Sequence, residues 1–193
     1  IATNTGRSVR FEESRVRPMG RSAAGVKGIW IDEEKLTEKA IGMVCIEDPE
    51  TQQLLVVSEK GFGKRSDVED YRLTNRGGKG VKALNITEKT GNLVAIKEVT
   101  DKNDLMIITK SGILIRIAVA DLRVMGRNTQ GVKLIRLKNE SDEISSVTKI
   151  VKDPEEEVVV DTDAVVVDAT DEVIPDIQSS VEEEGSVPLA DES

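Results

Sequence analysis

The sequence predicts an all-β protein, a propeller-like array of about three blades with four strands each, incomplete at both ends. Three observations lead to this fold class. Residues 1–152 contain three copies of one pattern, the copies are separated by short runs rich in valine and isoleucine, and no long stretch has the apolar period of a helix. Several short strands in each repeat are typical of stacked blades.

The repeat becomes visible when residues 6–31, 61–86 and 112–137 are aligned without gaps. These segments read GRSVRFEESRVRPMGRSAAGVKGIWI, GFGKRSDVEDYRLTNRGGKGVKALNI and GILIRIAVADLRVMGRNTQGVKLIRL. In each copy a second glycine follows the first by 19 residues, and Val-Lys comes directly after it. An arginine stands four residues, and another 15 residues, after the first glycine. Identities that recur three times in register indicate one structural unit repeated three times.

The apolar runs between the copies are predicted to be strands, because they are short, rich in β-branched residues and bounded by polar clusters. They cover residues 41–47, 53–59, 92–99, 104–110 and 143–151. The links EDPETQ and TDKND are predicted to be hairpin turns. Each repeat then holds its Val-Lys strand, two apolar runs and the strand after the first glycine. Residues 1–6 would end a strand that starts upstream, and the third repeat lacks its last strand.

The charge is divided unevenly along the chain. Residues 153–193 hold 15 acidic residues and no Lys or Arg, whereas residues 1–152 hold all 27 basic residues and 21 acidic ones, a net charge of +6. We therefore expect a β domain over residues 1–152 and an acidic, mostly disordered tail over residues 153–193. Two valine runs in the tail, residues 158–160 and 165–167, are candidates for the missing strand. The alternative for the tail is that it only keeps the protein soluble.

The composition excludes most catalytic classes. The chain has no histidine, and its single cysteine, Cys45, allows no intrachain disulfide and no cysteine-cluster metal site. We expect no catalytic residue, metal ion or cofactor in this chain. Without a membrane-spanning apolar run or a signal pattern, the protein is expected in the cytoplasm. Because the chain starts at Ile1, we expect it to be a piece of a longer protein.

The repeated cations are the candidate binding residues. A blade core does not require a cation at one place in every repeat, and equivalent cations in an arc form a curved surface suited to nucleic-acid phosphates. The alternative for the first arginine of each repeat is an ion pair inside its blade, and the repeated glycines are interpreted as structural. The candidates are Arg10, Arg21, Lys27, Lys64, Arg65, Arg76, Lys79, Lys82, Arg116, Arg127 and Lys133.

The kind of nucleic acid follows from what the sequence lacks. With only four aromatic residues there is no platform for stacking the bases of a single strand. No recognition helix is predicted that would read bases in a groove. The glycine-rich loops GRSAAGVK, NRGGKGVK and GRNTQGVK offer backbone N–H groups and cations to phosphate oxygens. These features favour backbone-directed binding of a duplex, with bending as a consequence.

These motifs, above all GRNTQGVKLIR, resemble the C-terminal domain of bacterial DNA gyrase A. The resemblance covers residues 1–151, roughly the last three blades of a β-pinwheel that wraps duplex DNA, and extends to the acidic tail. It implies a parent type II topoisomerase that introduces negative supercoils, with ATP and Mg²⁺ bound elsewhere. The implied partners are duplex DNA, the rest of gyrase A and gyrase B, in the bacterial cytoplasm at the chromosome.

Two departures from that family stand out. Its basic box, Q-R-R-G-G-K-G, has only a partial counterpart in TNRGGKG at residues 74–80, so the box itself is expected upstream. The family's catalytic tyrosine lies in a winged-helix domain, and Tyr71, here in a blade loop, is assigned no catalysis. The alternatives are the C-terminal domain of the corresponding topoisomerase IV protein, a propeller that binds a protein through its rim and, least favoured, an enzyme. The basic charge of residues 1–152 favours DNA over a protein partner.

Overall fold

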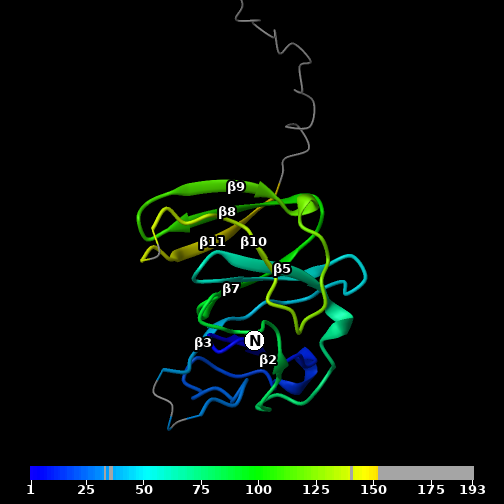
Figure 1. The fold of residues 1–193 in the computed structure, drawn as a ribbon. Helices are drawn as coiled ribbons and strands as arrows, with labels where there is room; N and C mark the ends of the chain where they lie inside the picture. Colours follow the sequence, from blue (N-terminus) through cyan, green and yellow to red (C-terminus); the bar gives the residue numbers. More distant parts are fainter. Residues whose placement is uncertain (33, 35–36, 140, 152–193) are drawn as a thin grey trace, which may run out of the picture. The chain divides into compact units, whose positions relative to one another are not determined.

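Three antiparallel sheets make up the regular structure, as Figure 1 shows. The computed structural model describes residues 1–32, 34, 37–139 and 141–151, so the predicted acidic tail lies outside the described residues. Apart from strands, the described residues contain only three short 3₁₀ turns, and none of their helices is long and apolar enough to cross a membrane. The all-β prediction is confirmed. The turns are η1 (Glu13–Arg15), η2 (Val68–Asp70) and η3 (Val119–Asp121).

Each sheet is built mainly from the strands of one repeat. The first has the order β3-β1-β2-β6, formed by β3 (Ala40–Gly42), β1 (Ala2–Thr3), β2 (Arg7–Ser8) and β6 (Val81–Lys82). The second has the order β10-β5-β4-β7, formed by β10 (Val132–Lys133), β5 (Phe62–Asp67), β4 (Gln53–Ser58) and β7 (Leu93–Val99). The third has the order β11-β8-β9, formed by β11 (Ile144–Val151), β8 (Asn103–Thr109) and β9 (Leu114–Ala118).

The outer strand of the first two sheets is donated by the following repeat. Val81 pairs with Ser8 on β2, and Val132 pairs with Gly63 on β5. The Val-Lys strands of the second and third repeats are therefore confirmed, but each completes the sheet before its own. In the first repeat Val26 and Lys27 form no strand. Within the described residues, β9 likewise has no strand on its outer side.

A glycine before each donated strand permits the close approach. Gly80 and Gly131 have φ values of +75° and +78°, in the left-handed region. A Cβ built on Gly80 would lie 2.3 Å from the carbonyl oxygen of Ser8, and one on Gly131 would lie 2.4 Å from that of Gly63. The structural interpretation of these two glycines is confirmed.

The hairpin predictions at the two links are wrong. β4 pairs with β5 and β7 and not with β3, and β8 pairs with β9 and β11 and not with β7. The links therefore lead from an edge strand of one sheet, β3 or β7, to the first strand of the next. The strands predicted at residues 53–59, 92–99, 104–110 and 143–151 are confirmed, whereas only residues 40–42 form a strand near the run 41–47.

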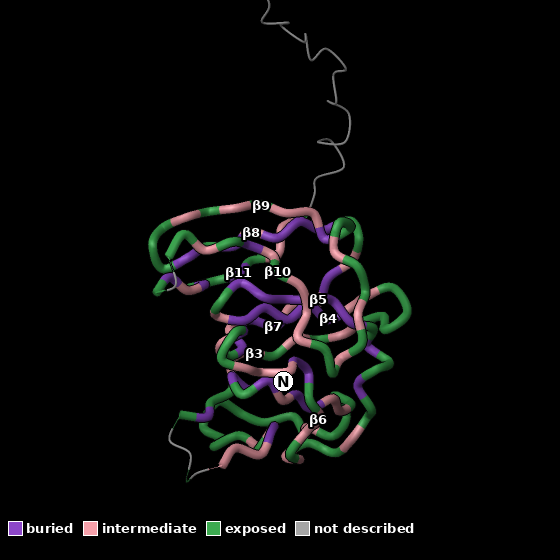
Figure 2. Tube along the Cα trace, in the orientation of Figure 1, coloured by how far each residue is buried: buried purple, intermediate pink, exposed green. Residues whose placement is uncertain are grey.

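The core lies between neighbouring sheets and is almost free of aromatic residues. Along β4, Leu54 and Val56 pack in a cluster with Ala2 and Leu84, toward the first sheet. The alternate residues of β4 pack in a second cluster with strands of the third sheet. This alternation is the period of a strand whose two faces are both buried. Figure 2 shows the buried residues concentrated along these central strands.

Candidate nucleic-acid interface

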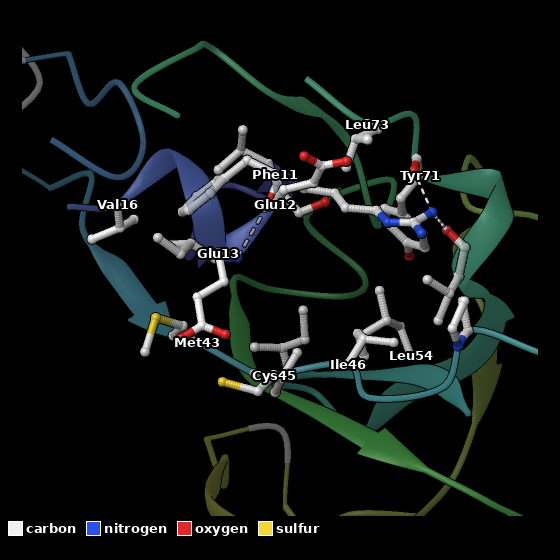
Figure 3. A pocket seen from close by; sticks show the side chains of 18 residues that line it. Phe11, Glu12, Glu13, Val16, Met43, Cys45, Ile46, Leu54, Tyr71 and Leu73 are labelled. Carbon is white, nitrogen blue, oxygen red and sulfur yellow. Dashed lines mark hydrogen bonds between the residues drawn. The ribbon is translucent and has the colours of Figure 1, made fainter. Parts of the chain in front are cut away.

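The first arginine of a repeat holds two neighbouring blades together. Nη1 of Arg10 donates hydrogen bonds to the carbonyl oxygens of Val68 (2.9 Å) and Tyr71 (3.2 Å), drawn in Figure 3. In the next repeat the buried Arg65 donates from Nε to the carbonyl oxygen of Leu122, and its Nη1 contacts Asp101. Tyr71 and Leu122 both end a 3₁₀ turn, where carbonyl groups lack partners within the turn. Both junctions are thus closed in the same way.

These contacts correct part of the predicted site. The guanidinium groups of Arg10 and Arg65 bind the following repeat, which gives both side chains a structural role. For Arg65 the alternative interpretation holds as well, because its partner Asp101 follows β7 of the same sheet. Arg116, at the same position in the third repeat, is exposed and pairs with Asp104 at 2.7 Å. The ion pair of the third repeat also lies within one sheet, between β9 and β8.

Lys64 is also corrected, because its side chain is buried. Its Nζ donates a hydrogen bond of 2.7 Å to the carbonyl oxygen of Gly126 in the third repeat. The pKa of Lys64 is lowered to about 8, mainly by burial; the charge of Asp70 opposes this shift, and the charge of Arg127 adds to it. Lys64 therefore adds a third link across the junction between the second and third repeats.

The lowered pKa of Lys64 predicts a stability that rises with pH. The ordinary pKa is 10.5 and the folded value is about 8, so between these values the unfolded chain binds more protons. The free energy of unfolding should therefore increase in this window, by up to about 1.4 kcal/mol per pH unit. Urea unfolding at several pH values will measure the rise. Lys64→Met, which lacks the titrating group, should lose it; a rise that persists in this variant would assign it elsewhere.

The glycine-rich loops, residues 20–27, 75–82 and 126–133, contact one another from repeat to repeat. Nη1 of Arg76 donates to the carbonyl oxygen of Lys27 (3.3 Å), and Nη1 of Arg127 donates to that of Lys82 (3.1 Å). Nε of Arg76 also donates to the carbonyl oxygen of Arg15 (3.1 Å). The second arginines of the second and third repeats are thereby fixed on the loop of the preceding repeat. The loops form one connected series across the three repeats.

The side chains of the remaining predicted cations lie at the surface of this series. Lys27 and Lys82 are exposed, and only their backbone oxygens take part in the contacts between loops. Lys79 lies over the ring of Trp30 with its Nζ 5.0 Å from the ring centroid, and Lys133 lies over Phe62 at 5.8 Å. Arg21 is exposed in the first loop. The structure thus brings together exposed cations at equivalent places in successive repeats.

An apolar pocket of about 480 Å³ lies beside Arg10 (Figure 3). Phe11, Val16, Leu54 and Met43 contribute to its lining, so it offers mainly carbon surface. None of the residues that line this pocket belongs to the glycine-rich loops. Within the part of the chain that the structure describes, no group of acidic and cysteine side chains could hold a metal ion.

A comparison with protein families bears directly on the three sheets. The family described as DNA gyrase C-terminal domain, beta-propeller, matches residues 1–43, 52–100 and 103–150. These segments contain β1 to β3, β4 to β7 and β8 to β11, so each match covers one repeat as the structure divides it. The chain belongs to the DNA gyrase C-terminal domain family. The resemblance inferred from the repeats is confirmed.

Relatives and solved structures agree with this assignment. DNA gyrase A of Staphylococcus aureus strains MRSA252 and COL is 46% identical over 157 residues, which are 81% of this chain and 17% of each relative. The chain therefore spans less than a fifth of these gyrase proteins. A solved DNA gyrase A C-terminal domain superposes with a TM-score of 0.68 at 23% identity, covering 77% of this chain and 49% of that one. For the C-terminal domain of DNA topoisomerase IV the TM-score is 0.70 at 22% identity, covering 77% and 45%. Both show the same fold, and the β-pinwheel prediction is confirmed.

The candidate cations predicted from the sequence omit one position that also recurs in every repeat of this gyrase domain. An arginine also stands 11 residues after the first glycine of every repeat, as Arg17, Arg72 and Arg123. All three side chains are exposed. The alignment that gave the other positions contains this one as well, so the signal was present in the sequence.

Proposed function

We propose that this chain binds duplex DNA along its glycine-rich loops and bends it, as the C-terminal part of a DNA gyrase A protein. The observation that carries the proposal is the recurrence of exposed cations on loops that are hydrogen-bonded from repeat to repeat. Such a series presents positive charge at regular intervals, as a phosphate backbone requires. Membership of the gyrase C-terminal domain family supports it.

Binding of this kind is directed at phosphates and carries little base specificity. Lys27, Lys82 and Lys133 are point charges that follow a backbone, and Arg76 and Arg127 are held in place by the preceding loop. In the parent enzyme the bent DNA would be presented for strand passage, and negative supercoiling would draw on ATP hydrolysis in gyrase B. ATP and Mg²⁺ would bind outside this chain, which itself would act as a non-catalytic part of a bacterial cytoplasmic isomerase.

The first test is the salt dependence of DNA binding. If about six cations contact phosphates, log affinity should fall with log salt concentration at a slope of about −5. Fluorescence anisotropy with a labelled duplex of arbitrary sequence, titrated at several salt concentrations, measures this slope. A slope near zero, with the affinity kept at high salt, would contradict the proposal.

A lysine variant tests whether the loops are the surface involved. Replacing Lys27, Lys82 and Lys133 with Gln should make the slope shallower by about 2.7, because three phosphate contacts are removed. The fold should be preserved, since the loop contacts use the backbone of Lys27 and Lys82. A matched control replaces Lys60, Lys102 and Lys138, exposed cations outside the repeated positions, with Gln. An equal change in both variants would mean that only net charge matters.

A further inference from the structure

We propose that Arg17, Arg72 and Arg123 form an additional row of phosphate contacts, and that Arg10 and Arg65 position two of them. The proposal rests on the proposed function, binding of duplex DNA, and identifies further residues that carry it. Three features support it: the exposure of the side chains, the lack of partners within the described structure, and, at Arg72 and Arg123, a backbone held on both sides of the arginine.

The three arginines are exposed and unpaired where other cations are not. Among the described residues, none of them makes a hydrogen bond or an ion pair through its side chain. Arg65 and Arg76, in contrast, donate to backbone carbonyl groups. An exposed guanidinium without a partner has its full set of N–H donors available in a planar fork. This fork matches the geometry of phosphate oxygens, so a phosphate is the ligand it fits best.

The backbone around Arg72 is fixed by the preceding repeat. The carbonyl oxygen of Tyr71 accepts a hydrogen bond from the guanidinium of Arg10, and Leu73 pairs with Arg10 in a parallel bridge. The N–H of Thr74 donates to the carbonyl oxygen of Arg10 at 2.8 Å. Tyr71 is 1% exposed, which anchors the segment, whereas the side chain of Arg72 is exposed.

The same arrangement recurs one repeat later around Arg123. Leu122 accepts a hydrogen bond from the guanidinium of Arg65, and Val124 pairs with Arg65 in a parallel bridge. The N–H of Met125 donates to the carbonyl oxygen of Arg65 at 2.8 Å. The first arginine of one repeat therefore acts as a positioning residue for the exposed arginine of the next. Rigid placement reduces the entropy lost when a long side chain binds.

The decisive variant replaces Arg17, Arg72 and Arg123 with Gln. For this variant the slope of log affinity against log salt concentration should be shallower by about 2.7, because three phosphate contacts are removed. Between 50 and 200 mM salt, the loss of affinity should therefore be about 40-fold smaller in the variant than in the wild type. The melting temperature should stay unchanged, because the three side chains make no hydrogen bonds or ion pairs within the described structure. The control is the variant with Gln at Lys60, Lys102 and Lys138, which removes the same charge and should keep a steeper slope.

The outcomes separate this inference from the proposed function. A wild type that binds with a steep slope, together with an arginine variant of equal slope, would overturn the additional row and leave the proposed function intact. Equal losses in the arginine variant and its control would also overturn it. A wild type without salt-dependent duplex binding would overturn both.

The positioning role has its own test. Arg10→Lys keeps the positive charge but loses the fork that bonds two carbonyl groups, so it should reduce the salt slope by about as much as Arg72→Gln, about 0.9. The double variant should lose no more than either single one, because both act through the same contact. Additive losses would show that Arg10 does not position Arg72.

Discussion

Replacing Gly131 with valine should destabilise the domain by about 4 kcal/mol or more and open the junction between the second and third repeats. The residue has a φ of +78°, which β-branched side chains disfavour, and its Cβ would lie 2.4 Å from the carbonyl oxygen of Gly63. The backbone cannot move away, because Val132 and Lys133 pair with β5. Gly80→Val should behave in the same way at the first junction. Thermal and urea unfolding measure both.

Gly25 provides a control within the same repeat pattern. It also has a positive φ, +83°, but nothing lies within 4 Å of a Cβ built on it. Gly25→Val should therefore show the cost of the backbone conformation alone, about 1–2 kcal/mol. If Gly25→Val and Gly131→Val were equally destabilising, the close approach of the donated strand would contribute nothing to stability.

Deleting residues 153–193 should tighten duplex binding about tenfold or more at low salt. The deleted segment carries 15 acidic residues, attached to a body with a net charge of +6. Covalent attachment gives such a polyanion an effective concentration on the order of millimolar, at which it would compete with DNA for the cations of residues 1–152. At physiological salt the Debye length is about 8 Å, so the gain should shrink as salt increases. Anisotropy titrations of both proteins across a salt series measure this difference.

A charge-neutral tail separates competition from any other effect of the deletion. Converting the acids of residues 153–193 to Asn and Gln keeps the chain length and the valines, and should reproduce the tighter binding. An affinity that is unchanged by either alteration at every salt concentration would leave the segment with the role of keeping the protein soluble.

The repeats and most strands could be predicted from the sequence, but their grouping into sheets could not. The pattern of apolar residues locates β4, β7, β8 and β11, because each is a short run that contains β-branched residues and is bounded by polar clusters. A periodic pattern has no marked beginning, however, and Val81 and Lys82 read equally well as part of their own blade or of the preceding one. The choice is made by the backbone approach at Gly80, which depends on tertiary structure.

The candidate site was predicted in the same partial way. Recurrence identifies cations at equivalent places, but it does not distinguish Arg65, which closes a junction, from Lys82, which faces solvent. Both kinds recur for good physical reasons, since a junction is repeated as faithfully as a binding surface. Lys64 has no counterpart in the other repeats, where Val9 and Ile115 stand at its place, and this difference is a sign of a local structural role.

The donated strands also set the order in which the chain can be completed during translation. β1 begins at Ala2, but β6, the last strand of its sheet, ends at Lys82. At about 5–20 residues per second, a ribosome needs roughly 4–16 s to synthesise that stretch. Throughout this interval the edge of β2 is an open template for strand pairing. The sheet can therefore close only after the following repeat has been synthesised, and slow translation of that repeat lengthens the time for which the edge stays open.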